Sequence, residues 1–370
     1  MSVVHVVVGG QFGSEAKGHV TGWLAKSPHV GAVVRVAGPN AGHTAHDAQG
    51  RPWALRQVPC AAVTNLDAKL YIAAGSEIDP LVLVDEIGRL EHAGIPVHHR
   101  LFVDPEATVI EEQHLIDETD LVGHIGSTGK GIGAARSARI MREASTWFGW
   151  IQTSPPILER FHPNTAPCAP SLLYTLNQGQ DVIIEGTQGF GLGLHASYYP
   201  FCTSSDCRAI DFLAMAGINP WASLSADGLP PELRIWPVFR TYPIRVAGNS
   251  GELYRELDWA ELAERTGGYI KPERTTVTRK IRRIGEWDAM LARRAMIANG
   301  WPSITLYPVL TFVDYWFPEL ADVENRETLD QHPELWGKIQ QIEEDLGNGP
   351  GYPHRLAAFT TGPDTLVPLV

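Results

Sequence analysis

An apolar run near the start of the chain leads directly into a glycine-rich loop. The run "VVHVVVGG" predicts a buried strand, and "GGQFGSEAKGH" follows it from Gly9 to His19. Gly13 permits a tight turn, and a helix starting near Ala16 would direct its free N–H groups at an anion. Lys17 adds a positive charge that can contact phosphate. This order of strand, loop and helix predicts a phosphate-binding turn, although the common G-x-x-x-x-G-K-S/T pattern does not fit it.

Strand-like runs and helical patterns alternate along the rest of the chain. The runs "GAVVRVAG", "KLYIAAG" and "DVIIEG" predict strands, and "PLVLVDEIGRLEHAG" predicts a helix from Pro80 to Gly94. A late amphipathic helix is expected from Glu334 to Gly347. This alternation predicts an α/β fold with a mostly parallel central sheet and helices on both faces. We expect residues 1–370 to form one domain, with irregular excursions near 143–170 and 225–285.

The charge of the chain argues against a nucleic-acid partner. The formal net charge is −12, whereas a nucleic-acid backbone requires a basic face. No apolar stretch approaches the roughly 20 residues that span a bilayer, and the start shows no basic segment followed by a cleavable apolar run. We therefore expect a cytoplasmic protein without a membrane partner, whose nucleotide ligands are small. The four cysteines form no C-x-x-C pair, so we expect reduced thiols and no zinc site.

Three further loops combine glycine with hydroxyl, amide or basic side chains. They are "GPNAGHT" (Gly38 to Thr44), "GSTGKGIGAARSARIMR" (Gly126 to Arg142) and "EGTQGFGLGLHASYYPFCTSSD" (Glu185 to Asp206). A basic segment, "RTTVTRKIRR" from Arg274 to Arg283, is unusual in an acidic chain and by itself predicts a solvated surface.

These motifs, taken in order, resemble adenylosuccinate synthetase. The order is G-Q-x-G-x-E-x-K-G, N-A-G-H-T, T-G-x-G-I-G, E-G-x-Q-G, Y-P-x-x-T-S-S, the basic segment, T-x-x-D and S/T-T-G-P-D, and it runs from Val3 to Asp364. The resemblance implies the P-loop-NTPase-like adenylosuccinate synthetase fold and a two-step ligase reaction. A nucleoside triphosphate would phosphorylate the 6-oxygen of a purine nucleotide. L-aspartate would then displace that phosphate, which is a good leaving group.

The resemblance implies roles for individual residues at the donor site. His43 would act as general acid on the 6-oxygen, with Ser14, Lys17 and Gln188 as further catalytic residues. Mg²⁺ would bind Ser14 and the Gly42 carbonyl, as suits a hard cation. The donor phosphates would contact Gly13, Ser14, Glu15, Ala16, Lys17, Gly18, Gly42, His43 and Thr44.

The donor base would contact Phe312, Asp314, Thr361, Gly362 and Pro363. Asp314 matches a family residue that reads the guanine of GTP, but Phe312 replaces a lysine that usually flanks that base. ATP and GTP therefore both remain candidate donors.

The resemblance implies a second group of contacts on the acceptor side. Ser14, Asn40, Ser127, Thr128, Gln188 and Thr203 match residues around the purine monophosphate. Arg142 matches an arginine that reaches the nucleotide of the neighbouring subunit, which implies a homodimer. The aspartate-binding residues would be Val246, Thr278, Lys280 and Arg282, so the basic segment is interpreted as a carboxylate clamp.

Ser14 is the main departure from the family pattern, which usually has an aspartate that takes the proton from N1 of inosinate. Serine is no general base near neutral pH unless a partner activates it. Its small hydroxyl leaves room for the C2 amino group of guanine, and the same replacement marks phage enzymes that resemble 2-aminoadenylosuccinate synthase.

The favoured hypothesis is a ligase that joins L-aspartate to C6 of dGMP. Its product would be N6-succino-2-amino-2′-deoxyadenylate, for a phage genome that contains diaminopurine. Two alternatives remain: an ordinary synthetase acting on IMP, and a nucleotide-binding switch without ligase activity.

Overall fold

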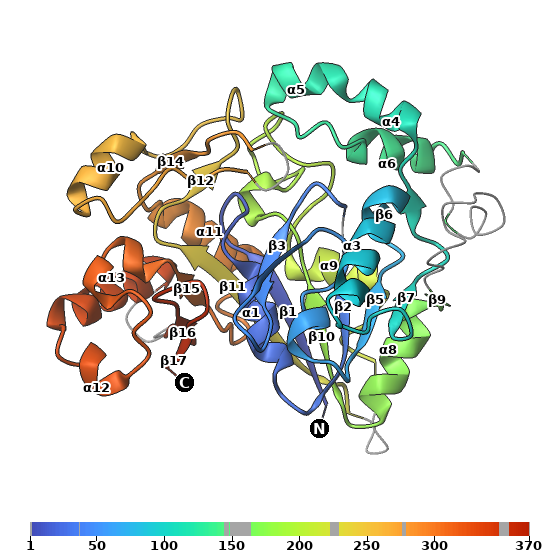
Figure 1. Ribbon diagram of the computed structural model, residues 1–370, viewed down its shortest axis with the longest axis horizontal. Helices are drawn as coiled ribbons and strands as arrows, with labels where there is room; N and C mark the ends of the chain where they lie inside the picture. Colours follow the sequence, from blue (N-terminus) through green and yellow to red (C-terminus); the bar gives the residue numbers. More distant parts are fainter. Residues whose placement is uncertain are drawn as a thin grey trace.

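A ten-stranded sheet forms the centre of the computed structural model (Figure 1). The model describes residues 2–36, 38–143, 148, 164–222, 229–275, 279–347 and 355–369. In spatial order the strands are β17 (Val367–Pro368), β16 (Ala358–Phe359), β15 (Val309–Thr311), β11 (Glu232–Arg240), β1 (Val3–Gly9), β10 (Asp181–Glu185), β2 (Val30–Arg35), β5 (Lys69–Ile72), β7 (Leu101–Val103) and β9 (Asn164–Thr165). Among these strands only β16 and β17 pair antiparallel. The predicted mostly parallel α/β sheet is confirmed.

Alternate residues of β1 point into two different hydrophobic cores. Val6 packs in one core with side chains of α8, α9, α11 and α13, and Val7 packs in the other with side chains of α1, α2 and α3. The helices are α1 (Lys17–Ala25), α2 (Ala61–Thr64), α3 (Pro80–His92), α8 (Cys168–Asn177), α9 (Ala209–Ala216), α11 (Ala289–Ala298) and α13 (Pro333–Gly347). Since every residue of β1 is buried, both faces of the sheet are covered, as a parallel sheet requires.

Local signals explain where the predicted helices begin and end. The Asp79 carboxylate accepts hydrogen bonds from the backbone N–H groups of Leu81 and Val82 at the start of α3, and Pro80 occupies the first turn. Gly94, just beyond the end of α3, has φ 81°, a conformation that glycine adopts without strain. Helix α13 confirms the predicted late amphipathic helix.

The prediction of an irregular excursion near 225–285 is wrong for Glu232–Arg240, which form the central strand β11. Pro237 obscured this strand in the sequence because proline donates no hydrogen bond to a sheet. The structure accommodates it because Pro237 pairs with β1 only, and pairing with β15 begins at the next residue, Val238. In the range near 143–170, residues 144–147 and 149–163 lie outside the described part, and the range ends in β9 and the start of α8.

A small unit follows β11 and has a core of its own. It contains β12 (Ile244–Arg245), β14 (Arg283–Gly285) and β13 (Glu256–Leu257) in one antiparallel sheet, with α10 (Trp259–Arg265) beside it. Its core is formed by Ile244, Trp259, Leu262, Ile270 and Ile284. Whether the chain forms a single domain stays a prediction.

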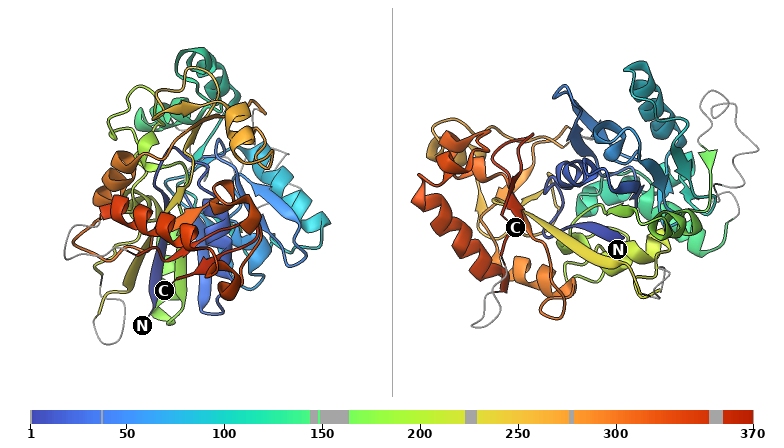
Figure 2. Two further views of the ribbon diagram at one scale, coloured as in Figure 1. Left: turned by 90° about the vertical axis from the view of Figure 1, so that its left-hand side faces the viewer. Right: turned by 90° about the horizontal axis from the view of Figure 1, so that it is seen from below.

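Most of the remaining elements border the carboxyl ends of the central strands, whereas α12 (Arg326–Leu329) lies near the C-terminus in Figure 1. The others are the hairpin β3 (His43–His46) and β4 (Pro52–Leu55), the pair β6 (Glu77–Ile78) and β8 (Thr108–Val109), the helices α4 (Glu112–Asp117), α5 (Thr119–Ile125) and α6 (Ile132–Ile140), and the 3₁₀ turns η3 (Phe190–Leu192), η4 (Val313–Tyr315) and η5 (Pro318–Leu320). Figure 2 shows the C-terminal helices at one side of the sheet and α4 to α6 at the other. Loops from β1, β2, β10 and β15 converge between them, where ligands of such sheets bind.

In the part of the chain that the structure describes, none of the helices has the length and apolar character needed to cross a membrane. All four cysteines are free thiols, as predicted.

Candidate functional site

Two large cavities and a small one lie at the loop end of the sheet. The first cavity has a volume of about 580 Å³, the second about 590 Å³, and the small one about 110 Å³. The small cavity shares lining residues with both large ones, so we call it the junction cavity. The three cavities together provide space for two ligands that meet at one place.

The first cavity gathers most of the residues predicted to hold the phosphate donor. Its predicted donor-phosphate residues are Ser14, Ala16, Lys17, Gly18, Gly42, His43 and Thr44. Its other end contains the predicted base contacts Phe312, Asp314, Gly362 and Pro363. Segments following β1, β2, β15 and β16, which are far apart in the sequence, therefore meet around one space.

The second cavity gathers most of the residues predicted to surround the purine monophosphate, although Ser14 does not line it. Asn40, Ser127, Thr128, Gln188, Thr203 and the predicted aspartate contact Val246 all line it. The junction cavity combines both sets: Ser14, Lys17 and His43 from the donor side meet Asn40, Thr128 and Gln188 from the other side. Gly13, Gly42, Val246 and Arg282 also line the junction. Ser14 thus stands on the path between the two large cavities.

Several predicted residues are not brought into these cavities. Thr361 is fully buried, and its hydroxyl donates to the Val323 carbonyl, whereas its neighbour Thr360 lines the first cavity. Lys280 and Arg142 are exposed and line none of the three cavities. Thr278 lies outside the described residues.

The glycine-rich loop folds around a carboxylate. Glu15 is fully buried and lines none of the three cavities; it accepts hydrogen bonds from the backbone N–H groups of Gln11 (3.2 Å) and Gly13 (2.7 Å). Its other oxygen contacts Lys17 Nζ at 2.7 Å, so the lysine is paired before any phosphate enters. Ser14 (φ 63°) and Ala16 (φ 61°) both adopt left-handed backbone conformations, which are uncommon without glycine. This geometry directs the Glu15 side chain inward and leaves Ser14 exposed.

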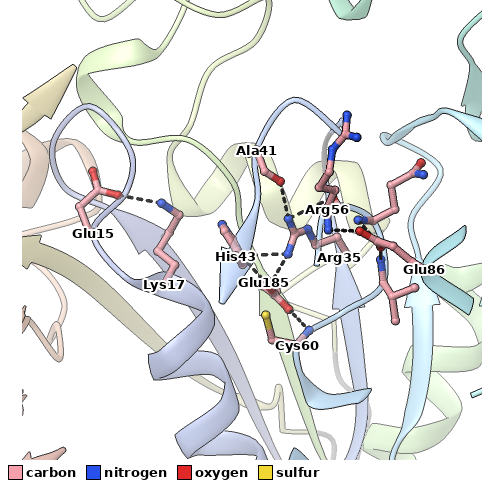
Figure 3. A network of polar contacts seen from close by, with 11 residues as sticks. Glu15, Lys17, Arg35, Ala41, His43, Arg56, Cys60, Glu86 and Glu185 are labelled. Carbon is pink, nitrogen blue, oxygen red and sulfur yellow. Dashed lines mark hydrogen bonds and ion pairs between the residues drawn. The ribbon is translucent and has the colours of Figure 1, made fainter. Parts of the chain in front are cut away.

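His43 belongs to a buried network with two charged residues (Figure 3). Its Nδ1 lies 2.6 Å from Glu185 Oε1 and 2.9 Å from Arg35 Nη1, and Arg35 Nη1 donates to the same Glu185 oxygen at 2.5 Å. The second Glu185 oxygen accepts from the backbone N–H of Cys60 at 2.8 Å. Because a carboxylate can only accept, the short contact places the imidazole proton on Nδ1.

The charges in this network determine what His43 offers to a ligand. Burial, followed by the Arg35 charge, lowers the pKa of His43 to about 3, so the imidazole is neutral near pH 7. Burial raises the pKa of Glu185, but Arg35 and His43 outweigh it and lower that pKa to about 2. Nε2 of His43 is buried and has no hydrogen-bond partner among the described residues. In the unliganded protein this nitrogen therefore carries a lone pair rather than a proton.

Sequence reasoning missed several residues of the site. Arg35 holds the loop after β2 by donating to the carbonyls of Ala41 (3.0 Å) and Arg56 (3.1 Å), and it is fully buried. Glu118 lines the second cavity and accepts from Gly131 N–H at 2.7 Å at the start of α6. Tyr269 lines the first cavity beside Asp314. Glu185 stands in the E-G-x-Q-G motif, which could have signalled its place in the site.

Comparison with known proteins identifies the family. The family model described as adenylosuccinate synthetase matches residues 6–149 and 149–314. The chain belongs to the adenylosuccinate synthetase family. It is 32% identical over 363 residues to the adenylosuccinate synthetase of Methanococcus maripaludis strain C6, covering 97% of this chain and 96% of that protein. It is 33% identical over 346 residues to that of Pyrococcus horikoshii, covering 92% of each. Members of this family are C–N ligases, and the alternative of a switch without ligase activity loses its support.

Two solved structures are similar over almost the whole chain. One is cyanophage S-2L succinoaminodeoxyadenylate synthetase, bound to dGMP and to dATP as an energy donor. It has a TM-score of 0.73 and 25% identity, and the match covers 98% of this chain and 93% of the phage protein. The other is the fully ligated adenylosuccinate synthetase of Plasmodium falciparum, with a TM-score of 0.76 and 20% identity, covering 99% and 100% of the two chains. The second likeness concerns the fold alone.

Proposed function

We propose that this protein joins L-aspartate to C6 of dGMP with hydrolysis of a nucleoside triphosphate. The product would be N6-succino-2-amino-2′-deoxyadenylate, a precursor of the diaminopurine nucleotide. The observation that carries this proposal is the position of Ser14, at the junction between the two large cavities. An exposed hydroxyl there, in place of the aspartate expected from the family pattern, leaves space beside N1 of a purine for an amino group on C2.

The assignment of the cavities follows from their lining. Lys17, paired with Glu15, and the loop around it place an ammonium group and backbone N–H groups at the first cavity, which suits donor phosphates. Hydroxyl and amide side chains of Thr128, Thr203 and Gln188 suit the purine monophosphate in the second cavity. Arg282 lines both the first cavity and the junction, where a guanidinium can hold a carboxylate of L-aspartate.

The reaction would take place at the junction. His43 Nε2 would lie near the purine 6-oxygen, and Glu185 would hold the imidazole ring in position. His43 acts as a general acid only after it gains a proton, and negative phosphate groups beside it would favour its charged form. Gln188 lines the same space and would orient the 6-oxygen. The proton on N1 would pass to a donor phosphate oxygen or to a water held by Ser14, since the hydroxyl itself is not a base.

A magnesium ion fits this arrangement because Ser14 and Gly42 both face the first cavity and the junction and offer oxygen atoms. The Ser14 hydroxyl and the Gly42 carbonyl would hold it together with phosphate and water oxygens. When bound, the ion would neutralise charge on the transferred phosphoryl group.

The similarity to the phage enzyme supports dGMP as the substrate, because that protein was solved with dGMP and has the same fold. The second candidate is adenylosuccinate synthesis from IMP. It is favoured by the archaeal relatives, which are adenylosuccinate synthetases and match almost the full chain.

The test is a direct comparison of dGMP, GMP and IMP as acceptors, each with L-aspartate, Mg²⁺ and either ATP or GTP. We expect product with dGMP at a kcat/KM at least tenfold above that with IMP. A preference for IMP would establish the second candidate instead. Nucleotide hydrolysis should require both a purine monophosphate and L-aspartate.

Arg142 is proposed to complete the purine monophosphate site of a neighbouring subunit. It is exposed just after α6 and lies away from the cavities of its own chain. In mixtures of an inactive His43→Gln chain with an inactive Arg142→Ala chain, activity should return, since mixed dimers contain one intact site. Absence of such complementation, with mixed dimers present, would contradict the proposed exchange of arginines.

A further inference from the structure

The base end of the first cavity contains a carboxyl group whose two oxygens are in different situations. Asp314 is 5% exposed and lines the cavity. Its Oδ2 accepts a hydrogen bond from the Tyr269 hydroxyl at 3.0 Å. Its Oδ1 is buried and has no hydrogen-bond partner within the described residues. A buried polar atom without a hydrogen-bond partner costs free energy, so we expect Oδ1 to accept a hydrogen bond from a ligand.

Two aromatic side chains border this carboxyl group. Tyr269 follows α10, is 40% exposed and lines the same cavity. Phe312 also lines the cavity, and the Arg240 guanidinium lies 4.1 Å from the centre of its ring. Arg240 also pairs with Glu273, so the charge behind the ring is compensated. The base end therefore includes two aromatic rings and one buried carboxylate oxygen without a hydrogen-bond partner among the described residues.

We propose that Tyr269 and Phe312 make this end of the cavity select an adenine nucleotide over a guanine nucleotide as phosphate donor. This inference rests on the proposed function only in taking the first cavity as the donor site.

Guanine would be recognised poorly by this arrangement. Its N1–H and N2–H donors lie side by side and match the two oxygens of a carboxylate, as a guanidinium does. Oδ2 already accepts a hydrogen bond from the Tyr269 hydroxyl, so Oδ1 is the Asp314 oxygen without a partner among the described residues. Guanine also presents the acceptor O6, and Phe312 has no donor to offer it. The second donor of guanine would compete with the Tyr269 hydroxyl for Oδ2, which weakens binding.

Adenine matches the same groups better. Its amino group can donate to Asp314 Oδ1, and its N1 carries no hydrogen that would compete with Tyr269 for Oδ2. The faces of Phe312 and Tyr269 can pack against the purine ring. Burial raises the pKa of Asp314 to about 6, so near pH 7.5 the group is mostly ionised and acts as an acceptor. Burial raises the pKa of Tyr269 to about 12, so its hydroxyl keeps the proton that it donates.

The experiment measures binding without turnover. Adenylyl imidodiphosphate and guanylyl imidodiphosphate are titrated calorimetrically, with Mg²⁺, into the wild-type protein, into Tyr269→Phe and into Tyr174→Phe. Tyr174 is 61% exposed on α8 and lines none of the three cavities, so it provides a matched control. No acceptor nucleotide or aspartate is present.

We expect the wild-type protein and Tyr174→Phe to bind the adenine analogue about tenfold more tightly, as the loss of one hydrogen bond would imply. Tyr269→Phe frees Oδ2 and should reduce this preference to near parity, chiefly through tighter binding of the guanine analogue. A wild-type preference for the guanine analogue would overturn the inference, and so would an unchanged preference in Tyr269→Phe or a failure of both analogues to bind. Lack of product from dGMP would refute the proposed function while leaving these affinities as an independent result.

Discussion

Replacing Ser14 by Asp gives the sharpest test of the proposal that this loop selects the purine. The change should cost little folding energy, because Ser14 is exposed and aspartate tolerates its left-handed backbone (φ 63°) well. Substitutions at such positions usually alter the free energy of unfolding by no more than about 0.5 kcal/mol. An effect on activity would therefore reflect chemistry at the junction cavity rather than loss of structure.

The expected gain is that of a general base placed beside N1. Such a base contributes about 10²- to 10⁴-fold to a reaction, so kcat/KM for IMP should rise by about 10²-fold, equivalent to about 2.7 kcal/mol of barrier. With dGMP the new carboxylate would crowd the C2 amino group, or pair with it in the ground state without helping the reaction. We expect kcat/KM for dGMP to fall by about 10-fold or more.

Ser14→Asn is the matched control because it has the shape of Asp without the charge. Product is followed by chromatography with IMP and dGMP in parallel, and folding by thermal unfolding. Ser14→Asn should lose activity with dGMP through crowding but gain none with IMP. If Asp and Asn behave alike, or if Ser14→Asp keeps the wild-type ratio of the two substrates, the argument about this position is wrong.

Three further expectations concern the buried network and the packing. Glu185→Gln should lower kcat by about 10²-fold with little change in KM, as steady-state kinetics would show. It should also lower the free energy of unfolding by about 3–5 kcal/mol, measured by urea unfolding, because Arg35 loses its ion pair with Glu185. As the pH falls from about 6.5 toward 3, His43 gains a proton in the unfolded chain but not in the folded protein, so the free energy of unfolding should decrease. Urea unfolding at several pH values should show a shallower decrease in His43→Gln. Gly10→Ala should destabilise the protein by about 1–3 kcal/mol, because its new methyl group would lie 2.1 Å from Phe239 Cε1. Gly337→Ala, in an open position on α13, should stabilise the protein by about 0.5–1 kcal/mol. Melting temperatures of the two variants would shift in opposite directions.

Much of the site could be predicted because its residues lie in loops that follow recognisable strands. Strands β1, β2 and β10 are apolar runs, and the motifs after them carry Lys17, His43 and Gln188 to the junction cavity. The contacts that hold these residues could not be predicted, because they join segments far apart in the chain. Glu185 reaches His43 across 142 positions, and Tyr269 reaches Asp314 across 45. Strand β11 was missed because a proline, here Pro237, argues against a strand when the sequence is read locally. That Pro237 pairs with β1 alone depends on the arrangement of the whole sheet.

Charge balance indicates that the loop does not require a carboxylate at position 14. The buried pair of Glu15 and Lys17 is already neutral, and Glu15 also holds the backbone of Gln11 and Gly13. A carboxylate at position 14 would add an exposed negative charge next to this pair, which donor phosphates would have to approach or which a cation would have to neutralise. With serine, Lys17 keeps its ion pair with Glu15, and the proposed purine would meet a neutral hydroxyl at the junction. The fold of the loop thus rests on Glu15 rather than on position 14, as the proposed role of Ser14 in purine selection requires.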